Sequence, residues 1–376
     1  MKKIGVFGGS FDPVHNEHIN MVKSAIKELA LDEIYVIPTY KAPHKKGAVA
    51  SSEDRYNMLC IAFKNVKNVI VSRYELNLKS TSYTYITISH FKSLFKDSEI
   101  YFLMGSDMLS SFKTWKNPQI IAQNANLVLI SRQGDNNLDT ASISEVKNLY
   151  NANVIVLNYV GSDVSSTLIR VNLSLGLDAS AYAPKEVIDY AIKNNVYSKN
   201  ELYNYVKNNL PLKRKIHTAG VIITAINLAK KLNVDKEKAE ISALLHDIAK
   251  YADIAKYACV KEILNCEDAI KHQYIGAYMA KNDLGVLDED VLDAIKYHST
   301  GKPNMSALLK VIYVADLIEP SRSYDGVDKI REEVNKDFES GFIYAVLEVL
   351  EFLKKKNEPI NQLTIDTAKY YKGEQL

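Results

Sequence analysis

The sequence predicts an α/β domain, with a parallel sheet and helices on both faces, followed by an all-α domain. Short apolar runs alternate with amphipathic segments in the first half, whereas the second half shows helical periodicity alone. A length of 376 residues suits two domains of ordinary size. We expect the domains to be 1–197 and 198–376, with the boundary near Tyr197-Ser198.

Composition excludes several classes of protein. The chain is 47% hydrophobic and 24% charged, so it can build cores and is not a disordered segment. Lys and Arg number 47 against 45 Asp and Glu, which argues against a general nucleic-acid binder. Three cysteines are too few and too scattered for a disulfide framework or a cysteine-based zinc site. Without a leader or an apolar span of membrane length, a cytoplasmic enzyme is expected, and a homodimer is left open.

The predicted strands of the first half are apolar runs separated by helical segments. They are Ile4–Phe7, Ile34–Ile37, Val69–Val71, Ile100–Leu103, Leu127–Ile130 and Val154–Leu157. A helix is expected from about Glu17 to Ala30. Ligands of such sheets bind beyond the carboxyl ends of the strands. The segments that follow strands therefore matter most: Gly8–His18, Lys41–Lys45, Gly105–Asp107 and Arg132.

The second half contains no convincing strand. Helical periodicity is clear over His217–Leu232, Lys236–Lys250, Ser306–Ile318 and Phe338–Lys355. Breaks are expected at Pro211, Pro303, Pro320 and Pro359, because proline stops helices. These features predict a helical bundle.

The first predicted strand ends in a motif suited to phosphate. Gly8 and Gly9 allow the backbone to approach a phosphate or a ribose closely. His15 and His18 lie on one face of the first turn of a helix, whose N-terminus carries positive potential. The alternative is a helix with two incidental histidines, which the complete string with Phe11-Asp12-Pro13 disfavours. Within that string, Asp12 is interpreted as a turn or cap residue.

The Gly8–His18 string resembles that of the H-x-x-H nucleotidyltransferase superfamily, whose domain is Rossmann-like. The superfamily carries a second signature of the form S-S-T-x-I-R, and this chain has Ser165–Arg170 just before a predicted helix. Hydroxyls and N–H groups at a helix start, with a guanidinium one turn in, suit a polyphosphate. Two phosphate signatures in the family's order make chance an unattractive explanation.

Within the superfamily, the first half is most similar to nicotinate-nucleotide adenylyltransferase. Lys41–Lys45 and Ser82–Thr84 resemble two loops of that family, and Gly105–Asp107 with Phe112 and Trp115 resembles its G-x-D…F…W run. Arg132 follows a strand, as the family's arginine does. Thr81 and Ile86 depart from the family's P-S-Y-T-x-D-T-L, which puts the detailed acceptor contacts in doubt.

This resemblance implies transfer of AMP from ATP to nicotinate mononucleotide, with Mg²⁺ bridging the phosphates. It implies that His18, Lys45 and Arg170 neutralise charge in the transition state, that His15 holds the triphosphate and that Asp107 accepts a ribose hydroxyl. Trp115 is expected to stack on the pyridine ring, the alternative being a half-buried anchor. The expected nucleotide-binding residues are Gly8, Gly9, Ser10, Phe11, His15, Thr84, Gly105, Asp107, Trp115, Arg132, Ser166 and Thr167.

The second half contains four histidines and two aspartates in a pattern typical of a metal centre. They are His217, His246, Asp247, His272, His298 and Asp316. His246-Asp247 and Asp316 lie in apolar helical stretches, where buried polar groups need partners that a metal supplies. The alternative is histidines bonded to the backbone and Asp316 paired with a cation.

The order H…HD…H…H…D resembles the HD-domain metal phosphohydrolases, and within them the symmetrical diadenosine-tetraphosphate hydrolases. The supporting strings are Ala243–Lys250, His298–Gly301 and Ala315–Arg322, with Ser299-Thr300 as a minor departure. A nitrogen and oxygen donor set without thiolates suits two ions of iron, or of manganese or zinc.

The resemblance implies that His217, His246, Asp247 and Asp316 hold one ion. His272 and His298 would hold the second, with Asp247 bridging, while Lys250 and Arg322 bind phosphates. Hydrolysis of diadenosine tetraphosphate at this centre would give two ADP.

Two alternatives stay open. The first domain could use another acceptor, nicotinamide mononucleotide or phosphopantetheine. The second could be a non-catalytic nucleotide sensor, although a binding module has no need of two hydrolytic metals.

Overall fold

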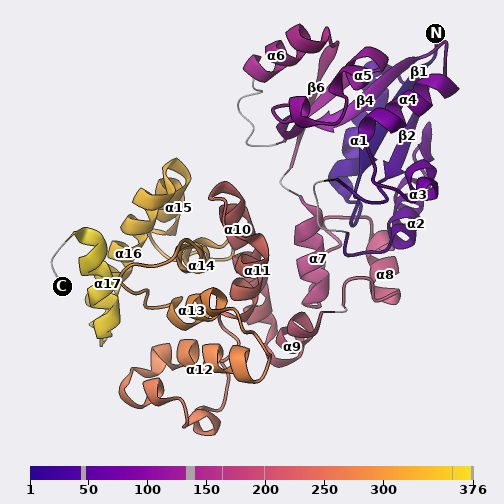
Figure 1. Cartoon of the computed structure of the whole chain (residues 1–376). Helices are drawn as coiled ribbons and strands as arrows, with labels where there is room; N and C mark the ends of the chain where they lie inside the picture. The colour runs from indigo at the N-terminus through magenta and orange to yellow at the C-terminus, as the bar shows by residue number, and fades with distance from the viewer. Residues whose placement is uncertain (44–47, 133–139, 163, 199, 358, 374–376) are drawn as a thin grey trace. The chain divides into compact units, whose positions relative to one another are not determined.

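The computed structural model describes residues 1–43, 48–132, 140–162, 164–198, 200–357 and 359–373 (Figure 1). The chain divides into two compact units. The first consists of Met1–Leu173 with Asp178–Lys199, and the second of Ser174–Leu177 with Asn200–Leu376. The predicted order, an α/β fold followed by a helical region, is confirmed.

The first unit is built on a parallel sheet whose strand order is β3-β2-β1-β4-β5-β6. The strands are β1 (Lys3–Gly9), β2 (Glu33–Pro38), β3 (Val69–Val71), β4 (Glu99–Gly105), β5 (Asn126–Arg132) and β6 (Val154–Gly161). All neighbours pair in parallel. The order reverses between β1 and β4, and ligands of such sheets bind at that switch point.

Both faces of this sheet are buried, which explains the continuous apolar runs of its strands. Successive residues point to opposite faces: Val6 packs with α4 (Thr84–Leu94), α5 (Pro118–Asn124) and α6 (Thr140–Tyr150). Its neighbour Phe7 packs with α1 (Asn16–Leu29), α2 (Ser52–Phe63) and α8 (Lys185–Lys193). The remaining helical segments of this part are α3 (Tyr74–Leu78), η1 (Ser106–Met108), η2 (Phe112–Thr114) and α7 (Ser166–Ser174).

The second unit has no strand in the residues that the structure describes. Its α-helices are α9 (Glu201–Asn209), α10 (Leu212–Lys231), α11 (Lys236–Leu245), α12 (Asp268–Asn282), α13 (Glu289–Tyr297), α14 (Ala307–Ile318), α15 (Val327–Lys336), α16 (Phe338–Lys355) and α17 (Gln362–Lys372). Two 3₁₀ segments, η3 (Ile254–Tyr257) and η4 (Lys261–Asn265), precede α12. Helix α10 packs against α11 and α14, and α13 packs against α11, α12 and α14.

Two predicted helix limits were wrong, and both errors concern the histidines. Helix α10 begins at Leu212, directly after Pro211, so His217 lies in its second turn and not at its start. Helix α11 ends at Leu245 and not at Lys250. The following residues form tight turns, with Ile248 N–H donating to Leu245 O and Lys250 N–H to Asp247 O. This change of geometry places the adjacent side chains of His246 and Asp247 at one centre.

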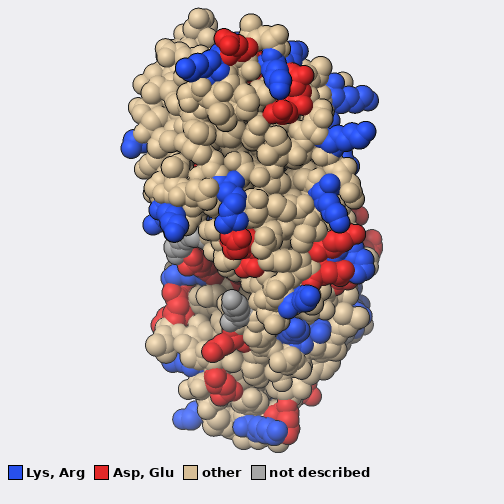
Figure 2. All heavy atoms as spheres, turned by 90° about the vertical axis from the view of Figure 1, so that its right-hand side faces the viewer, with Lys and Arg blue, Asp and Glu red and all other residues tan. Residues whose placement is uncertain are grey.

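Charged side chains of both signs lie on the surface of the described residues (Figure 2). On the face drawn in Figure 2, Lys and Arg side chains are intermixed with Asp and Glu. No helix in the described part of the chain combines the length and the apolar character needed to cross a bilayer.

Candidate active sites

The two phosphate signatures of the first unit meet in the structure. Arg170 Nη1 on α7 donates to the carbonyl oxygen of Asp12 at 2.8 Å, and its Nη2 donates to Thr167 Oγ1 at 3.1 Å. Ser166 Oγ donates to the carbonyl oxygen of Pro13 at 2.8 Å. The start of α7 is thereby joined to the loop after β1, although more than a hundred residues separate them in sequence.

His15 and His18 lie together at the positive end of α1. Their ring centroids are 3.7 Å apart, and the backbone N–H of His15 donates to His18 Nδ1 at 3.2 Å. Phe11 is only 2% exposed and packs against His18, with centroids 5.0 Å apart. The Phe11 side chain therefore supports the histidine from the core, so any contact it makes with a nucleotide must come from its backbone.

The side chain of Asp12 holds the loop after β1 in place through hydrogen bonds. Its carboxylate accepts from the N–H groups of Val49 and Ala50, at 2.8 and 3.1 Å, and from the Tyr197 hydroxyl at 2.9 Å. The side chain is 6% exposed. These contacts agree with a turn-holding residue and leave the carboxylate no position from which to act as an acid catalyst.

A cavity of about 670 Å³ opens beside the glycine loop. Five of the predicted nucleotide-binding residues line it: Gly8, Gly9, Ser10, Thr84 and Trp115. Trp115 is half-buried against Phe112, with ring centroids 5.4 Å apart, so it is both an anchor and part of the wall. A cavity of this size suits a mononucleotide.

The loops after β2 and before α4 are joined at this cavity. The backbone N–H of Ser82 donates to Lys41 O at 2.9 Å, and Tyr40 N–H donates to Ser82 Oγ at 3.0 Å. Thr81, one of the departures from the family string, forms a bridge with Lys41. Lys45 lies outside the described residues, as does the side chain of Arg132 at the end of β5.

Gly105 ends β4 at the carboxyl end of the sheet, and Asp107 lies two residues beyond it. A Cβ at Gly105 would overlap Asp107 Oδ1, so this glycine allows the exposed aspartate to fold back over the strand end. Neither residue lines the cavity described above. The carboxylate of Asp107 therefore lies at the carboxyl end of the sheet, outside this cavity.

Sequence reasoning missed two buried charged residues of this unit. Arg55 on α2 is 1% exposed and donates to Ser10 O and Thr39 O, both at 2.7 Å. It ties the glycine loop to the end of β2. Glu75 lines the cavity and accepts from Thr87 Oγ1 at 2.6 Å, and burial raises the pKa of its carboxyl. Neither lies in a phosphate signature, so their roles were visible only from contacts.

Replacing Arg55 by leucine is expected to destabilise the first unit by about 2–4 kcal/mol, because two buried carbonyls lose their donor. Urea unfolding followed by fluorescence measures this, since Trp115 is the only tryptophan and lies in the first unit. Arg73→Leu is the matched control: its ion pair with Glu53 is exposed, so we expect a much smaller change in the free energy of unfolding. Equal losses for the two variants would contradict the assignment.

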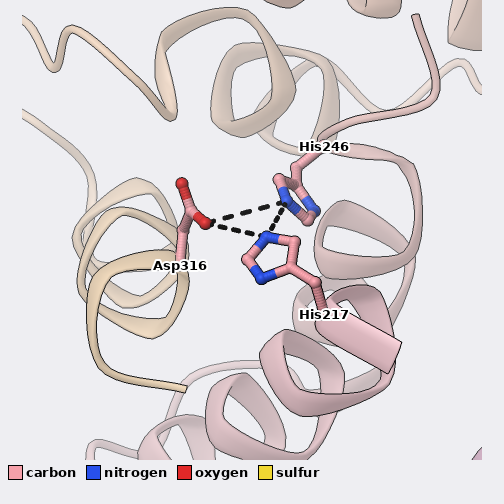
Figure 3. A group of neighbouring side chains, drawn as sticks. All are labelled: His217, His246 and Asp316. Atoms are coloured by element: carbon pink, nitrogen blue, oxygen red, sulfur yellow. Dashed lines mark hydrogen bonds and ion pairs between the residues drawn. The ribbon is translucent and has the colours of Figure 1, made fainter. Parts of the chain in front are cut away.

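All six predicted ligands of the second unit lie together. His217 Nε2 is 3.2 Å from His246 Nε2 and 3.0 Å from Asp316 Oδ1 (Figure 3). These side chains come from α10, the turn after α11, and α14. His272 Nε2 on α12 is 3.3 Å from His298 Nε2, directly after α13. Two trios can each hold a metal ion: His217–His246–Asp316 and His246–Asp247–His298. Within each trio, the ligand atoms lie within 4.8 Å of one another.

Asp247 stands between two groups of donors. Its Oδ2 is 3.5 Å from His246 Nε2 and 3.8 Å from His217 Nε2. Its Oδ1 is 3.3 Å from His272 Nε2 and 3.8 Å from His298 Nε2. Each oxygen of one carboxylate thus faces a different set of imidazoles, an arrangement suited to a carboxylate that bridges two ions.

Two of the imidazoles are oriented by backbone carbonyls. His246 Nδ1 donates to Ala243 O at 2.7 Å, and His298 Nδ1 donates to Ile295 O at 2.8 Å. A carbonyl only accepts, so each Nδ1 carries the proton and each Nε2 presents a lone pair to the centre. The backbone contacts expected under the non-metal alternative therefore exist, but they leave the ligand nitrogens available.

The electrostatics of the cluster favour neutral imidazoles at His272 and His298, whereas at His217 burial is outweighed by the carboxylates of Asp316 and Glu319, which raise its pKa. Burial lowers the pKa of His272 to about 3 and of His298 to about 4, and neighbouring positive charges add to the effect. Burial opposes ionisation of Asp247, yet the imidazoles around it hold its pKa well below the usual range. Neutral imidazoles and ionised carboxylates are the forms that bind divalent metals, so the residues present fit such a centre.

Three cationic side chains surround the cluster. Arg322 Nη2 donates to Asp316 Oδ1 at 2.5 Å, which is the cation pairing anticipated as the alternative for Asp316. Arg214 Nη1 pairs with Asp247 Oδ2, a contact that sequence reasoning missed. Lys250 Nζ lies 3.4 Å from each ring nitrogen of His272. Cations in these positions can bind the phosphates of a substrate.

Comparison with known proteins agrees with both sites. A cytidylyltransferase-like family model matches residues 6–172, and an HD domain model matches residues 214–321. The fold and the sites therefore define a protein that joins a nucleotidyltransferase-type domain to an HD domain, a class whose HD part binds divalent metals.

Similarity to individual proteins identifies the family within this class. The chain is 31% identical over 329 residues to a Mycoplasma genitalium protein named probable nicotinate-nucleotide adenylyltransferase/Ap4A hydrolase, covering 86% of this chain and 89% of that protein. The chain belongs to this two-domain family.

Single-domain relatives are also similar. The chain is 43% identical over 162 residues to a symmetrical bis(5'-nucleosyl)-tetraphosphatase of Bacillus subtilis, which covers 41% of this chain and 87% of that protein. It is 37% identical over 199 residues to a probable nicotinate-nucleotide adenylyltransferase of Clostridium perfringens, covering 52% of this chain and 98% of that protein.

Proposed function

We propose that this chain is a bifunctional enzyme. The first unit transfers AMP from ATP to nicotinate mononucleotide, giving deamido-NAD and pyrophosphate, and the second unit hydrolyses diadenosine tetraphosphate to two ADP. The names of the relatives support both activities. The observation that carries the second is the position of Asp247, whose two oxygens face two separate groups of imidazoles.

In the transferase reaction, a phosphate oxygen of the acceptor attacks the α-phosphorus of ATP, and the bond to pyrophosphate breaks. His18 and Arg170 neutralise the developing charge together with Lys45, while His15 holds the triphosphate. The backbone N–H of Ser166 and the hydroxyl of Thr167, at the start of α7, donate to phosphate oxygens, and Trp115 stacks on the pyridine ring in the cavity. Mg²⁺ with ATP bridges the phosphates.

In the hydrolase reaction, water attacks a central phosphorus and ADP leaves. His217, His246 and Asp316 would hold one ion, His272 and His298 would hold the other, and Asp247 would serve both. Two bound divalent ions polarise the attacked phosphate and lower the pKa of a water. Iron is the first candidate, followed by manganese and zinc. Arg214, Arg322 and Lys250 bind the outer phosphates and stabilise the charge on the departing ADP.

The first test is product analysis of the purified chain given diadenosine tetraphosphate, with and without Fe²⁺ or Mn²⁺. We expect ADP as the sole nucleotide product, only with metal, and none from His246→Ala, which removes a buried ligand nitrogen. AMP transfer to nicotinate mononucleotide by the same preparation controls for folding. If no ADP forms with any metal while AMP transfer is intact, the second unit is not a hydrolase of this substrate, and the alternative function as a nucleotide sensor would apply. Faster transfer to nicotinamide mononucleotide or phosphopantetheine would reassign the acceptor.

A further inference from the structure

His217 differs from the other ligand histidines in the partner of its second nitrogen. Its Nε2 faces the cluster, whereas its Nδ1 lies 3.0 Å from Glu319 Oε1. His246 and His298 use neutral backbone carbonyls in the same position. Glu319 directly follows α14, one turn after Asp316, and is 1% exposed. The outer nitrogen of His217 therefore contacts a buried carboxylate in place of a neutral carbonyl.

The other contacts of Glu319 determine which nitrogen of His217 carries the proton. Ser321 N–H donates to Oε2 at 2.7 Å, and Ser321 Oγ donates to Oε1 at 2.5 Å. Because these donors surround the carboxylate, it is ionised and can only accept. His217 Nδ1 must therefore be a donor, which leaves Nε2, the nitrogen that faces His246 and Asp316, as the one that would bind a metal ion.

Gly220 provides the space that this carboxylate occupies. It lies one turn after His217 on α10, and a Cβ there would overlap Glu319 Oε2 and lie 3.1 Å from Glu319 Cδ. Gly276 on α12 offers the contrast. Its Cβ would meet only ordinary neighbours, Ile295 Cγ2 at 3.5 Å and His246 O at 3.6 Å. Both are mid-helix glycines one turn after a ligand histidine, but only Gly220 is sterically required.

We propose that Glu319 is a positioning residue that fixes the tautomer and orientation of His217, and that Gly220 is required because it makes room for Glu319. The inference rests on the proposed metal centre of the second unit. A carboxylate on the outer nitrogen also makes the ligand nitrogen more basic, and so strengthens its bond to a metal. Glu319 touches neither substrate nor metal.

Mn²⁺ titration of the full chain, followed by electron paramagnetic resonance, tests the proposal without using activity. Glu319→Gln keeps the shape but removes the charge and can present its amide donor to Nδ1. We expect Mn²⁺ affinity to fall about 10–100-fold for Glu319→Gln and in the same direction for Gly220→Ala. Gly276→Ala should bind like the parent chain. Unchanged affinity in Glu319→Gln would overturn the proposal, and so would equal losses in the two glycine variants.

A second measurement covers the case in which a variant does not fold. Long-range ¹H–¹⁵N spectra of the parent chain report which ring nitrogen of His217 is protonated, with the resonance assigned by comparison with His217→Gln. We expect a proton on Nδ1, and an Nδ1 that carries none would refute the role of Glu319. A parent chain that binds no Mn²⁺ at all would instead sink the metal centre itself. The Nδ1–H tautomer would then still show that Glu319 orients His217.

Discussion

Asp247→Asn is expected to lower kcat/KM for diadenosine tetraphosphate by about a thousandfold or more, since it weakens the side chain that lies between both groups of donors. An amide presents one oxygen and one N–H₂ group, so one of the two sets of imidazoles would face a donor in place of an acceptor. The partly buried charge of Arg214 would also lose its counter-charge. Metal content should fall together with activity.

Steady-state hydrolysis and elemental analysis of the same preparation measure this effect. Asp293→Asn is the matched control, because Asp293 pairs with Lys302 and is not part of the cluster. It should keep hydrolysis within about twofold, as expected for a partly exposed ion pair. An Asp247→Asn protein with two bound metals and near-normal hydrolysis would refute the bridging role.

His18→Ala is expected to reduce kcat for AMP transfer by about 10²–10³-fold, because the proposed mechanism makes this imidazole a donor to the developing phosphate charge. The loss should appear in kcat more than in KM, since the interaction is strongest in the transition state. Hydrolysis by the second unit should persist, because its ligands lie in a separate compact unit.

Initial rates of pyrophosphate release, with nicotinate mononucleotide varied, give both constants. His90→Ala controls for loss of an imidazole in the same unit: His90 stacks on Tyr74 at 3.9 Å and does not line the cavity. A drop shared by both variants would indicate a stability effect. An unchanged kcat in His18→Ala would remove the histidine from the charge-neutralising set.

The periodicity of the sequence was sufficient to predict the fold class. Each predicted run, from Ile4–Phe7 to Val154–Leu157, lies within an observed strand, because strands buried on both faces are continuously apolar. The helix limits at His217 and Lys250 were less accurate. The end of α11 depends on the turn that presents His246 and Asp247, and an apolar stretch continues through it without a break signal.

Local sequence alone therefore determined the alternation of strands and helices and the identity of the six metal-ligand candidates. It also determined the two phosphate signatures, the glycine-containing Gly8–His18 and the hydroxyl-containing Ser165–Arg170. These features reside in residue type and short spacing, which dictate chemistry without reference to distant contacts. Only the tertiary structure decided that Arg55 ties the glycine loop to β2, that Asp247 divides its oxygens between two donor groups, and that Glu319 lies over Gly220 to orient His217. The physical reason is that each of these roles is a contact between segments far apart in the chain, and a buried charge takes its function from the partners that folding brings to it.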